Sequence, residues 1–142
     1  MKKKTPDFTV LNHTADLGIR AHGTDLRDLF ENTARAMLQT MVRIRPGGKA
    51  ATIRLSLDGQ DLADLMVRWL GEILYLIAGE DKVVLDVEID SITPSHLRAS
   101  VEYVPFDPEL HEIQCEIKAV TYHQIDVSRK NGLWQATVVF DL

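Results

Sequence analysis

The period of the apolar residues changes along this chain, and that change is the strongest constraint on its fold. From residue 24 to residue 41, apolar side chains recur every three or four positions, which predicts an amphipathic helix with Thr24 as its N-cap. A second stripe of this period follows Asp58, the expected cap of a second helix, and ends near Gly79. The rest of the chain is β-rich. Because βαβα alternation is missing from the second half, the pattern favours an α+β fold over a doubly wound parallel sheet.

Short links join the expected strands, and such links are typical of antiparallel hairpins and meanders. The expected strands are residues 8–11, 17–21, 51–57, 83–92, 96–104, 113–120, 122–127 and 134–140. A chain of 142 residues with 45% hydrophobic residues fits one compact domain. We therefore expect a single domain over residues 1–142, with a mainly antiparallel (mixed) β-sheet and the two α-helices packed on one face.

Charge and cysteine content narrow the functional class. Sixteen Lys and Arg residues against 21 Asp and Glu residues give a net charge of −5, which argues against a broad nucleic-acid footprint. The single cysteine, Cys115, can form no intramolecular disulfide, which indicates a reducing compartment. No apolar run approaches the roughly 20 residues that span a bilayer, and the basic start lacks the apolar core of a signal peptide. We expect a cytoplasmic protein without membrane attachment.

Familiar enzyme motifs are missing from the sequence. The Gly47-Gly48 pair has neither the spacing nor the following helix of a phosphate-binding loop. Paired Cys or His spacings of a zinc site and a Gly-x-Ser-x-Gly elbow are also missing. An independent enzyme would have to use scattered Asp and His residues.

Three polar segments interrupt the apolar pattern, and each has two interpretations. The segment "NHTAD", residues 12–16, is either a turn whose side chains bond their own backbone or a binding loop. In "KAVTYHQIDV", alternation places His123 on the same face as apolar residues, which favours a partly buried imidazole over a ligand or acid-base group. The closing "FDL" is either a solvated strand end or part of a metal site.

Taken together, the acids of these segments suit a divalent cation. Ca²⁺ and Mg²⁺ prefer hard oxygen ligands, which the Asp16 and Asp141 carboxylates and the α-carboxylate of Leu142 would supply. The neutral imidazole of His13 would also suit a transition metal. Local patterns leave open whether Asp16 and Asp141 meet.

Five segments resemble the archease family, in the same order and over essentially the whole chain. They are "NHTADLGIRAHG", "LRDLFENTARAM", "DLADLMVRWLGEILYLI", "FDPELHEIQCEIKAVTYHQIDV" and "LWQATVVFDL". Archeases are small proteins that activate RtcB-type RNA ligases, which join RNA ends in tRNA splicing and repair. The resemblance implies a non-catalytic protein that promotes transfer of GMP onto the ligase's active-site histidine, restores turnover and broadens nucleotide use. RNA would be contacted only through the ligase.

The resemblance also implies a metal site. The divalent ion of the family, usually calcium, is held by the Asp of "HTAD" and by the chain terminus, which correspond here to Asp16, Asp141 and the α-carboxylate of Leu142. We therefore expect Ca²⁺, with Mg²⁺ or Mn²⁺ as alternatives. The residue before "HTAD" is commonly acidic in relatives and is Asn12 here, which reduces the charge at the site but leaves an amide oxygen that can coordinate.

Two other functional classes are weighed against the ligase activator. A free-standing metal-dependent hydrolase should turn over a phosphoester without a partner, and the missing nucleophile argues against it. A general chaperone-like binding module should suppress aggregation of unrelated proteins, yet no long flexible or Met-rich exposed segment is evident.

Overall fold

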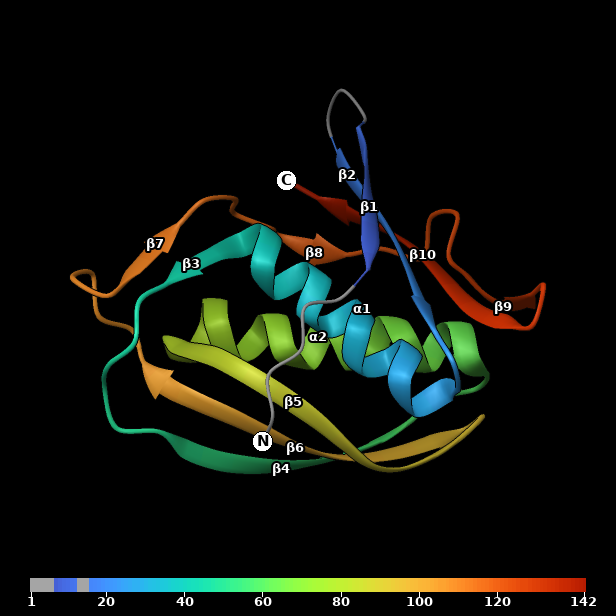
Figure 1. Ribbon diagram of the computed structural model, residues 1–142, viewed down its shortest axis with the longest axis horizontal. Helices are drawn as coiled ribbons and strands as arrows, with labels where there is room; N and C mark the ends of the chain where they lie inside the picture. Colours follow the sequence, from blue (N-terminus) through green and yellow to red (C-terminus); the bar gives the residue numbers. More distant parts are fainter. Residues whose placement is uncertain (1–6, 13–15) are drawn as a thin grey trace.

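The computed structural model describes residues 7–12, with Asn12 described by its backbone alone, and residues 16–142. These residues form two helices and ten strands (Figure 1). Their order is β1 (Phe8–Asn12), β2 (Asp16–Gly23), α1 (Leu26–Met41), β3 (Val42–Ile44), β4 (Ala51–Asp58), α2 (Leu62–Glu80), β5 (Lys82–Thr93), β6 (His96–Pro105), β7 (His111–Ile113), β8 (Ala119–Val120), β9 (Asp126–Lys130) and β10 (Leu133–Asp141).

The strands divide into three antiparallel sheets. The first has the order β1-β2-β10-β8, with β9 also paired to β10, and the second has the order β4-β6-β5. Strands β3 and β7 form a small third sheet. The predicted α+β fold with two helices and antiparallel strands is therefore confirmed.

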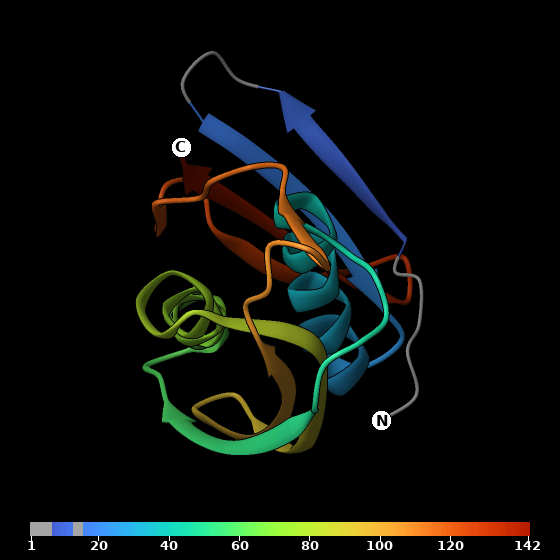
Figure 2. The ribbon, with the colours of Figure 1, turned by 90° about the vertical axis from the view of Figure 1, so that its left-hand side faces the viewer.

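Both helices lie between the two larger sheets, as the views in Figures 1 and 2 show. Helix α1 contacts β2 and β10 of the first sheet and β5 of the second, and α2 contacts β8 and β9 on one side and β4 and β5 on the other. Each larger sheet thus has helices on one of its faces. The sequence pattern predicted one sheet with the helices on one face, and it did not indicate that the strands divide into two larger sheets on either side of the helices.

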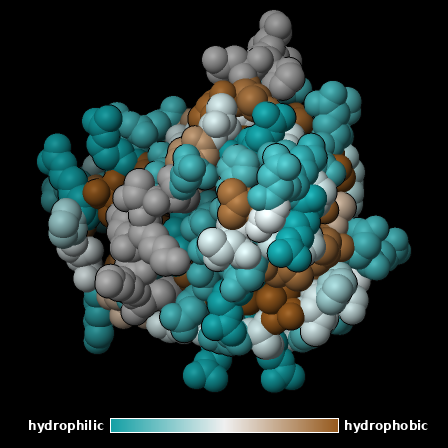
Figure 3. Space-filling model, turned by 45° about the vertical axis from the view of Figure 1, so that its right-hand side comes forward, coloured by the Kyte–Doolittle hydropathy of each residue, from teal (hydrophilic) through white to brown (hydrophobic). Residues whose placement is uncertain are grey.

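The core fills the space around the helices. Its largest fully buried side chains include Trp69 of α2, Phe30 of α1 and Phe140 of β10, and the Trp69 indole N–H donates to the Phe30 carbonyl at 2.9 Å. The face of the molecule in Figure 3 is mostly hydrophilic, with apolar atoms in small patches. Within the described part of the chain, neither helix combines the length and apolarity needed to cross a membrane.

Each helix begins at an aspartate that the sequence pattern did not select. The N-caps are Asp25 and Asp61, which accept from the backbone N–H of Asp28 and of Asp64, both at 2.8 Å, so the predicted caps Thr24 and Asp58 are wrong. In α1 the carboxylate of Asp28 accepts from the N–H of Thr24, the residue before the cap, and in α2 Asp64 does the same for Gln60. This arrangement is similar to a capping box, but the bonded N–H belongs to the residue before the cap, and Asp takes the place of Glu.

Charged side chains on one side of α1 contact the edge of β5, and two of them, Glu31 and Arg35, are buried. Arg27, Glu31 and Arg35 are spaced by four and lie along one side of the helix, facing the edge of β5. Arg27 donates to the Asp90 carbonyl and Arg35 to the Val87 carbonyl, whereas Glu31 accepts from the Ile89 N–H. A strand edge leaves backbone groups unpaired, so these side chains stabilise β5 in place of a further strand.

The sequence prediction is wrong between residues 113 and 127. Only Ala119 and Val120 of β8, Ile113 of β7 and the start of β9 are in strands there, and β3 was not predicted. In residues 114–118 the backbone makes isolated hydrogen bonds instead of a strand ladder; for example, the Gln114 N–H donates to the Met41 carbonyl at 2.8 Å. Alternation indicates an extended backbone, but a strand also needs a partner, which only the tertiary fold supplies.

Candidate functional site

Asp16 and Asp141 lie opposite each other across two paired strands. Asp16 begins β2, Asp141 ends β10, and the antiparallel register pairs their Cα atoms. Directly opposed residues have Cβ atoms about 4.5–5.5 Å apart and share a face of the sheet. The structure therefore brings together two predicted site residues that are 125 positions apart, by the difference 141 − 16.

The end of β10 is fixed on its other side by β8. Asp141 pairs with Ala119, and the Asp141 carbonyl accepts from the Lys118 N–H at 2.8 Å. One residue pair further on, the Val139 carbonyl accepts from both the N–H and the hydroxyl of Thr121. Asp141 thus lies on a strand end that is hydrogen-bonded on both edges, which gives its side chain a rigid support.

The two carboxylates differ in their surroundings. The Asp16 side chain is half-buried, whereas Asp141 and the following Leu142 are exposed. Like charges directly opposite each other destabilise a strand pair unless a cation lies between them. Hard carboxylate oxygens suit Ca²⁺, Mg²⁺ or Mn²⁺, so the residues present fit a divalent cation.

A divalent cation bound by Asp16 and Asp141 would need further oxygen ligands. Among residues 7–12 and 16–142, no cluster of three or more His, Cys, Asp or Glu side chains has a metal-binding arrangement. The predicted α-carboxylate of Leu142 would be the third ligand, with water completing the shell. The hypothesis for His13 lies outside the described residues, as does the side-chain contribution of Asn12.

Lys118 is a neighbour of the site that sequence reasoning missed. Its side chain is exposed, and its backbone N–H is bonded to Asp141 itself. This backbone contact joins residues 23 apart, by 141 − 118, and therefore has no local signal in the sequence.

The loop after β8 corrects the prediction for His123. That side chain is exposed in the turn between β8 and β9, whereas a partly buried imidazole was expected. The chain leaves the strand direction there, with Gln124 at φ 53°, so the alternation does not continue. Neighbouring Tyr122 instead reaches α2, where its hydroxyl donates to the Asp64 carboxylate at 2.6 Å.

Asp64 connects this loop to α2. It accepts from Tyr122 and from the Gln60 N–H, and it forms an ion pair with Arg68 at 2.9 Å. The hydrogen bond from Tyr122 is the largest cause that lowers the pKa of Asp64 from 3.8 to about 2, and the bonds from Gln60 and Arg68 act in the same direction. The same contact raises the pKa of the Tyr122 hydroxyl.

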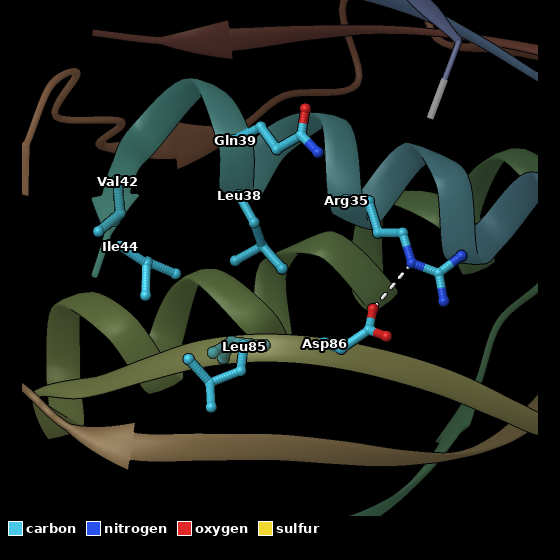
Figure 4. A pocket seen from close by; sticks show the side chains of 8 residues that line it. Arg35, Leu38, Gln39, Val42, Ile44, Leu85 and Asp86 are labelled. Atoms are coloured by element: carbon cyan, nitrogen blue, oxygen red, sulfur yellow. Dashed lines mark hydrogen bonds and ion pairs between the residues drawn. The ribbon is translucent and has the colours of Figure 1, made fainter. Parts of the chain in front are cut away.

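A small cavity of about 70 Å³ lies between α1, β3 and β5 (Figure 4). Leu38, Val42 and Leu85 form much of its apolar wall, and Arg35 and Asp86 form its polar end. The Arg35 guanidinium donates to Asp86 at 2.8 Å, with both side chains less than a tenth exposed. Since Arg35 also bonds β5 backbone, this cavity is best explained as part of the contact between α1 and β5.

The fold and the carboxylate pair define the class: a small α+β protein in which two neighbouring strands present opposed acids at their shared end. The sequence model of the Archease protein family matches residues 8–142, so the chain belongs to that family.

Individual relatives match over nearly the full chain. An archease of Pyrococcus furiosus is 38% identical over 134 residues, covering 92% of this chain and 94% of the relative. An archease of Methanosarcina mazei is 31% identical over 146 aligned positions, covering 100% of both chains.

Two solved structures share the fold. The solution structure of Methanobacterium thermoautotrophicum protein 1598 has a TM-score of 0.69 and 29% identity, covering 95% of this chain and 98% of that one. The crystal structure of a Thermotoga maritima archease, described as a possible chaperone, has a TM-score of 0.66, covering 100% of this chain and 98% of that one. At 18% identity the second likeness concerns the fold alone.

Proposed function

We propose that this protein is a non-catalytic activator of an RtcB-type tRNA-splicing and RNA-repair ligase, promoting ligase guanylylation and multiple turnover. The observation that carries the proposal is the cross-strand pair of Asp16 and Asp141 in a chain of the archease family. A net charge of −5 suits docking on a basic, RNA-binding ligase surface, since opposite charges steer association. RNA would then be contacted only through the ligase.

We further propose that Asp16, Asp141 and the α-carboxylate of Leu142 bind a divalent cation. Ca²⁺ is the expected ion, and Mg²⁺ or Mn²⁺ are alternatives with the same preference for oxygen ligands. When bound, the ion would supply positive charge between the opposed carboxylates. The protein's own part is to hold these oxygens on a strand end that is paired with both β2 and β8.

Two mechanisms are compatible with this site. Guanylylation requires divalent ions that neutralise phosphate charge, so an acidic site presented to the ligase would help align a metal there. Alternatively, docking would bias the ligase toward an open state, and a metal held by the carboxylates would serve only to fix the start of β2 to the end of β10.

The test is ligation beyond one turnover, using ligase, excess GTP, divalent metal and RNA ends. Wild-type protein with a free C-terminus should restore multiple turnover and Asp16→Ala should not. Asp58→Ala is the matched control, because Asp58 is an exposed acid at the end of β4. If wild type changes nothing with a matched ligase, the activator proposal is wrong.

The two mechanisms are separated by Asp141→Asn and by calorimetric titration with Ca²⁺. The amide removes a negative charge while keeping the size of the side chain. If Ca²⁺ binding is lost and ligase activation is lost with it, the metal acts in activation. If Ca²⁺ binding is lost but activation is retained, metal loading is not the mechanism of activation.

The alternative function is that of a general chaperone-like protein-binding module. The Thermotoga maritima relative is described as a possible chaperone, which is the observation that keeps this alternative. A chaperone should suppress aggregation of an unrelated unfolded protein at stoichiometric amounts, independently of Asp16. Suppression by wild type and Asp16→Ala alike, without ligase activation, would favour the chaperone.

A further inference from the structure

A groove of about 400 Å³ opens at the end of the molecule where α2 finishes. Its apolar wall is formed by Met41, Ile77, Val83, Phe106, Ile113 and Ile117. Figure 2 faces this end, where the C-terminal turns of α2 lie beside the chain that runs from β6 through β7 to β8. Phe106 and Ile113 are 39% and 46% exposed, so the groove contains two large apolar side chains that water reaches.

Main-chain hydrogen bonds fix both walls of this groove. Asp81 caps α2 in the left-handed conformation at φ 53°, and its carbonyl accepts from the Phe106 N–H at 2.9 Å. On the other side, the Met41 carbonyl accepts from Gln114 and Cys115. A groove with fixed walls can bind a partner with little loss of its own conformational entropy.

The charge around the groove is of one sign. Asp81 and Glu116 line it, both are exposed, and Lys, Arg and His are missing from its described lining. The adjacent Lys82 is directed elsewhere, since its ammonium pairs with Glu80 at 2.9 Å and lies 5.5 Å from the centre of the Tyr103 ring. An apolar groove with acidic edges favours apolar side chains that are flanked by lysine or arginine.

The groove is also connected to the carboxylate site through one short segment. Ile117 lines the groove, and the next residue, Lys118, donates its backbone N–H to Asp141. A partner seated in the groove would therefore lie beside the chain that supports the end of β10.

We propose that this groove docks an extended segment of a partner protein in which aliphatic or aromatic residues are flanked by lysine or arginine. Resting on the function proposed above, that partner is the RNA ligase. Phe106 and Ile113 supply the apolar contacts that hold the segment, and Asp81 and Glu116 select its positive charge. Exposed charges at an interface edge act mainly on association rate and salt dependence, whereas buried apolar contacts set the dissociation rate.

The recognition chemistry is tested without the ligase, by NMR titration of the labelled protein with three synthetic peptides of equal length. One alternates leucine with lysine, one alternates leucine with glutamate, and one alternates serine with lysine. The leucine-lysine peptide should shift amides of Asp81, Phe106 and residues 113–117 and bind at least about fivefold more tightly than the others. Equal binding of all three, shifts confined to another surface, or no binding would overturn the proposal.

Matched variants assign the effect to the groove. Ile113→Ala and Glu116→Lys should each weaken binding of the leucine-lysine peptide, and the effect of Glu116→Lys should shrink at high salt. Leu133→Ala and Glu88→Lys are controls, because Leu133 is a similarly exposed strand residue and Glu88 is an exposed acid on β5. Equal losses in the groove variants and the controls would contradict the assignment.

The ligase is then tested as the occupant. With wild type activating the ligase, Ile113→Ala should weaken direct ligase binding by about fivefold or more, and the peptide should compete. If wild type activates but Ile113→Ala binds ligase normally, the groove is not the ligase site, although the activator function stands. If peptide binding is normal but wild type fails to activate, the function is wrong rather than the recognition chemistry. A second copy would be the occupant if sedimentation shows a dimer that Ile113→Ala dissociates.

Discussion

Arg35→Met is expected to destabilise this protein strongly, although Arg35 lies outside the candidate site. The Arg35 guanidinium donates to Asp86 at 2.8 Å and to the Val87 carbonyl at 3.1 Å, and it lies 3.8 Å from the Glu31 carboxylate. The second carboxylate oxygen of Asp86 has no hydrogen-bond partner within the described chain. Methionine keeps much of the length and apolar bulk of arginine but leaves a buried carboxylate without its cation.

The magnitude follows from this burial. Removing one member of a buried ion pair costs about 3–5 kcal/mol, because the remaining charge is desolvated and unpaired. A domain of this size has a free energy of unfolding of about 5–15 kcal/mol, so the variant should lose a substantial fraction of its stability. With a urea dependence of about 1–3 kcal/mol per molar, the unfolding midpoint should fall by at least about 1 M.

Urea denaturation followed by far-ultraviolet circular dichroism measures this loss. Arg68→Met is the matched control, since Arg68 also pairs with an aspartate at 2.9 Å but its side chain is 53% exposed. That variant should be much less destabilised than Arg35→Met, because solvent screens an exposed ion pair. The double variant Arg35→Met/Asp86→Leu should be more stable than Arg35→Met alone, because no carboxylate is left unpaired at residue 86. Equal stability of Arg35→Met and Arg68→Met, or a double variant less stable than Arg35→Met, would refute the reasoning.

Three further predictions concern the glycines, the loop after β8 and the helix caps. Gly23→Ala should destabilise the fold by about 1–3 kcal/mol or more, because the added Cβ would overlap backbone atoms of Leu29. At Gly71 nothing lies within 4 Å of an added Cβ, so Gly71→Ala should be neutral or stabilise α2 by up to about 1 kcal/mol. Thermal unfolding of the two variants distinguishes these outcomes. Because the pKa of Asp64 is lowered from 3.8 to about 2, its contribution to folding stability should be present above about pH 4 and lost as the pH falls toward 2. Titration of the Asp64 carboxyl followed by carbon NMR should give this low pKa, and Tyr122→Phe should raise it. Asp25→Ala and Asp61→Ala should each cost about 0.5–2 kcal/mol in urea denaturation, and loss with Thr24→Ala as large as with Asp25→Ala would contradict the assigned cap.

Local patterns identified most of the secondary structure. Both helices were predicted because their apolar stripes are long, and long periodic segments are the most reliable signal in a sequence. The caps were misplaced by one residue at Asp25 and by three at Asp61. Two residues that can cap a helix, Thr24 and Asp25, precede the first stripe, and Asp58 and Asp61 precede the second. Only the direction in which the chain enters the helix decides which of them caps it.

The segment from residue 113 to residue 127 was mispredicted for a different reason. Its alternation of apolar and polar residues is real, since Cys115 and Ile117 pack against the core while Glu116 and Lys118 are exposed. An extended segment becomes a strand only where another strand lies alongside, and here β10 reaches only as far as Ala119 and Val120. The hydrogen bond from the Tyr122 hydroxyl to the Asp64 carboxylate joins residues 58 apart, so the local sequence gave no signal for it.

The sequence by itself determined the two helices, the β-rich remainder and the acids of the candidate site, because helix stripes, strand alternation and side-chain chemistry are properties of neighbouring residues. The tertiary structure alone decided that the helices lie between two sheets and that α1 covers the edge of β5. It also decided that Asp16 faces Asp141, since strand register depends on which segments far apart in the chain bury their apolar faces together.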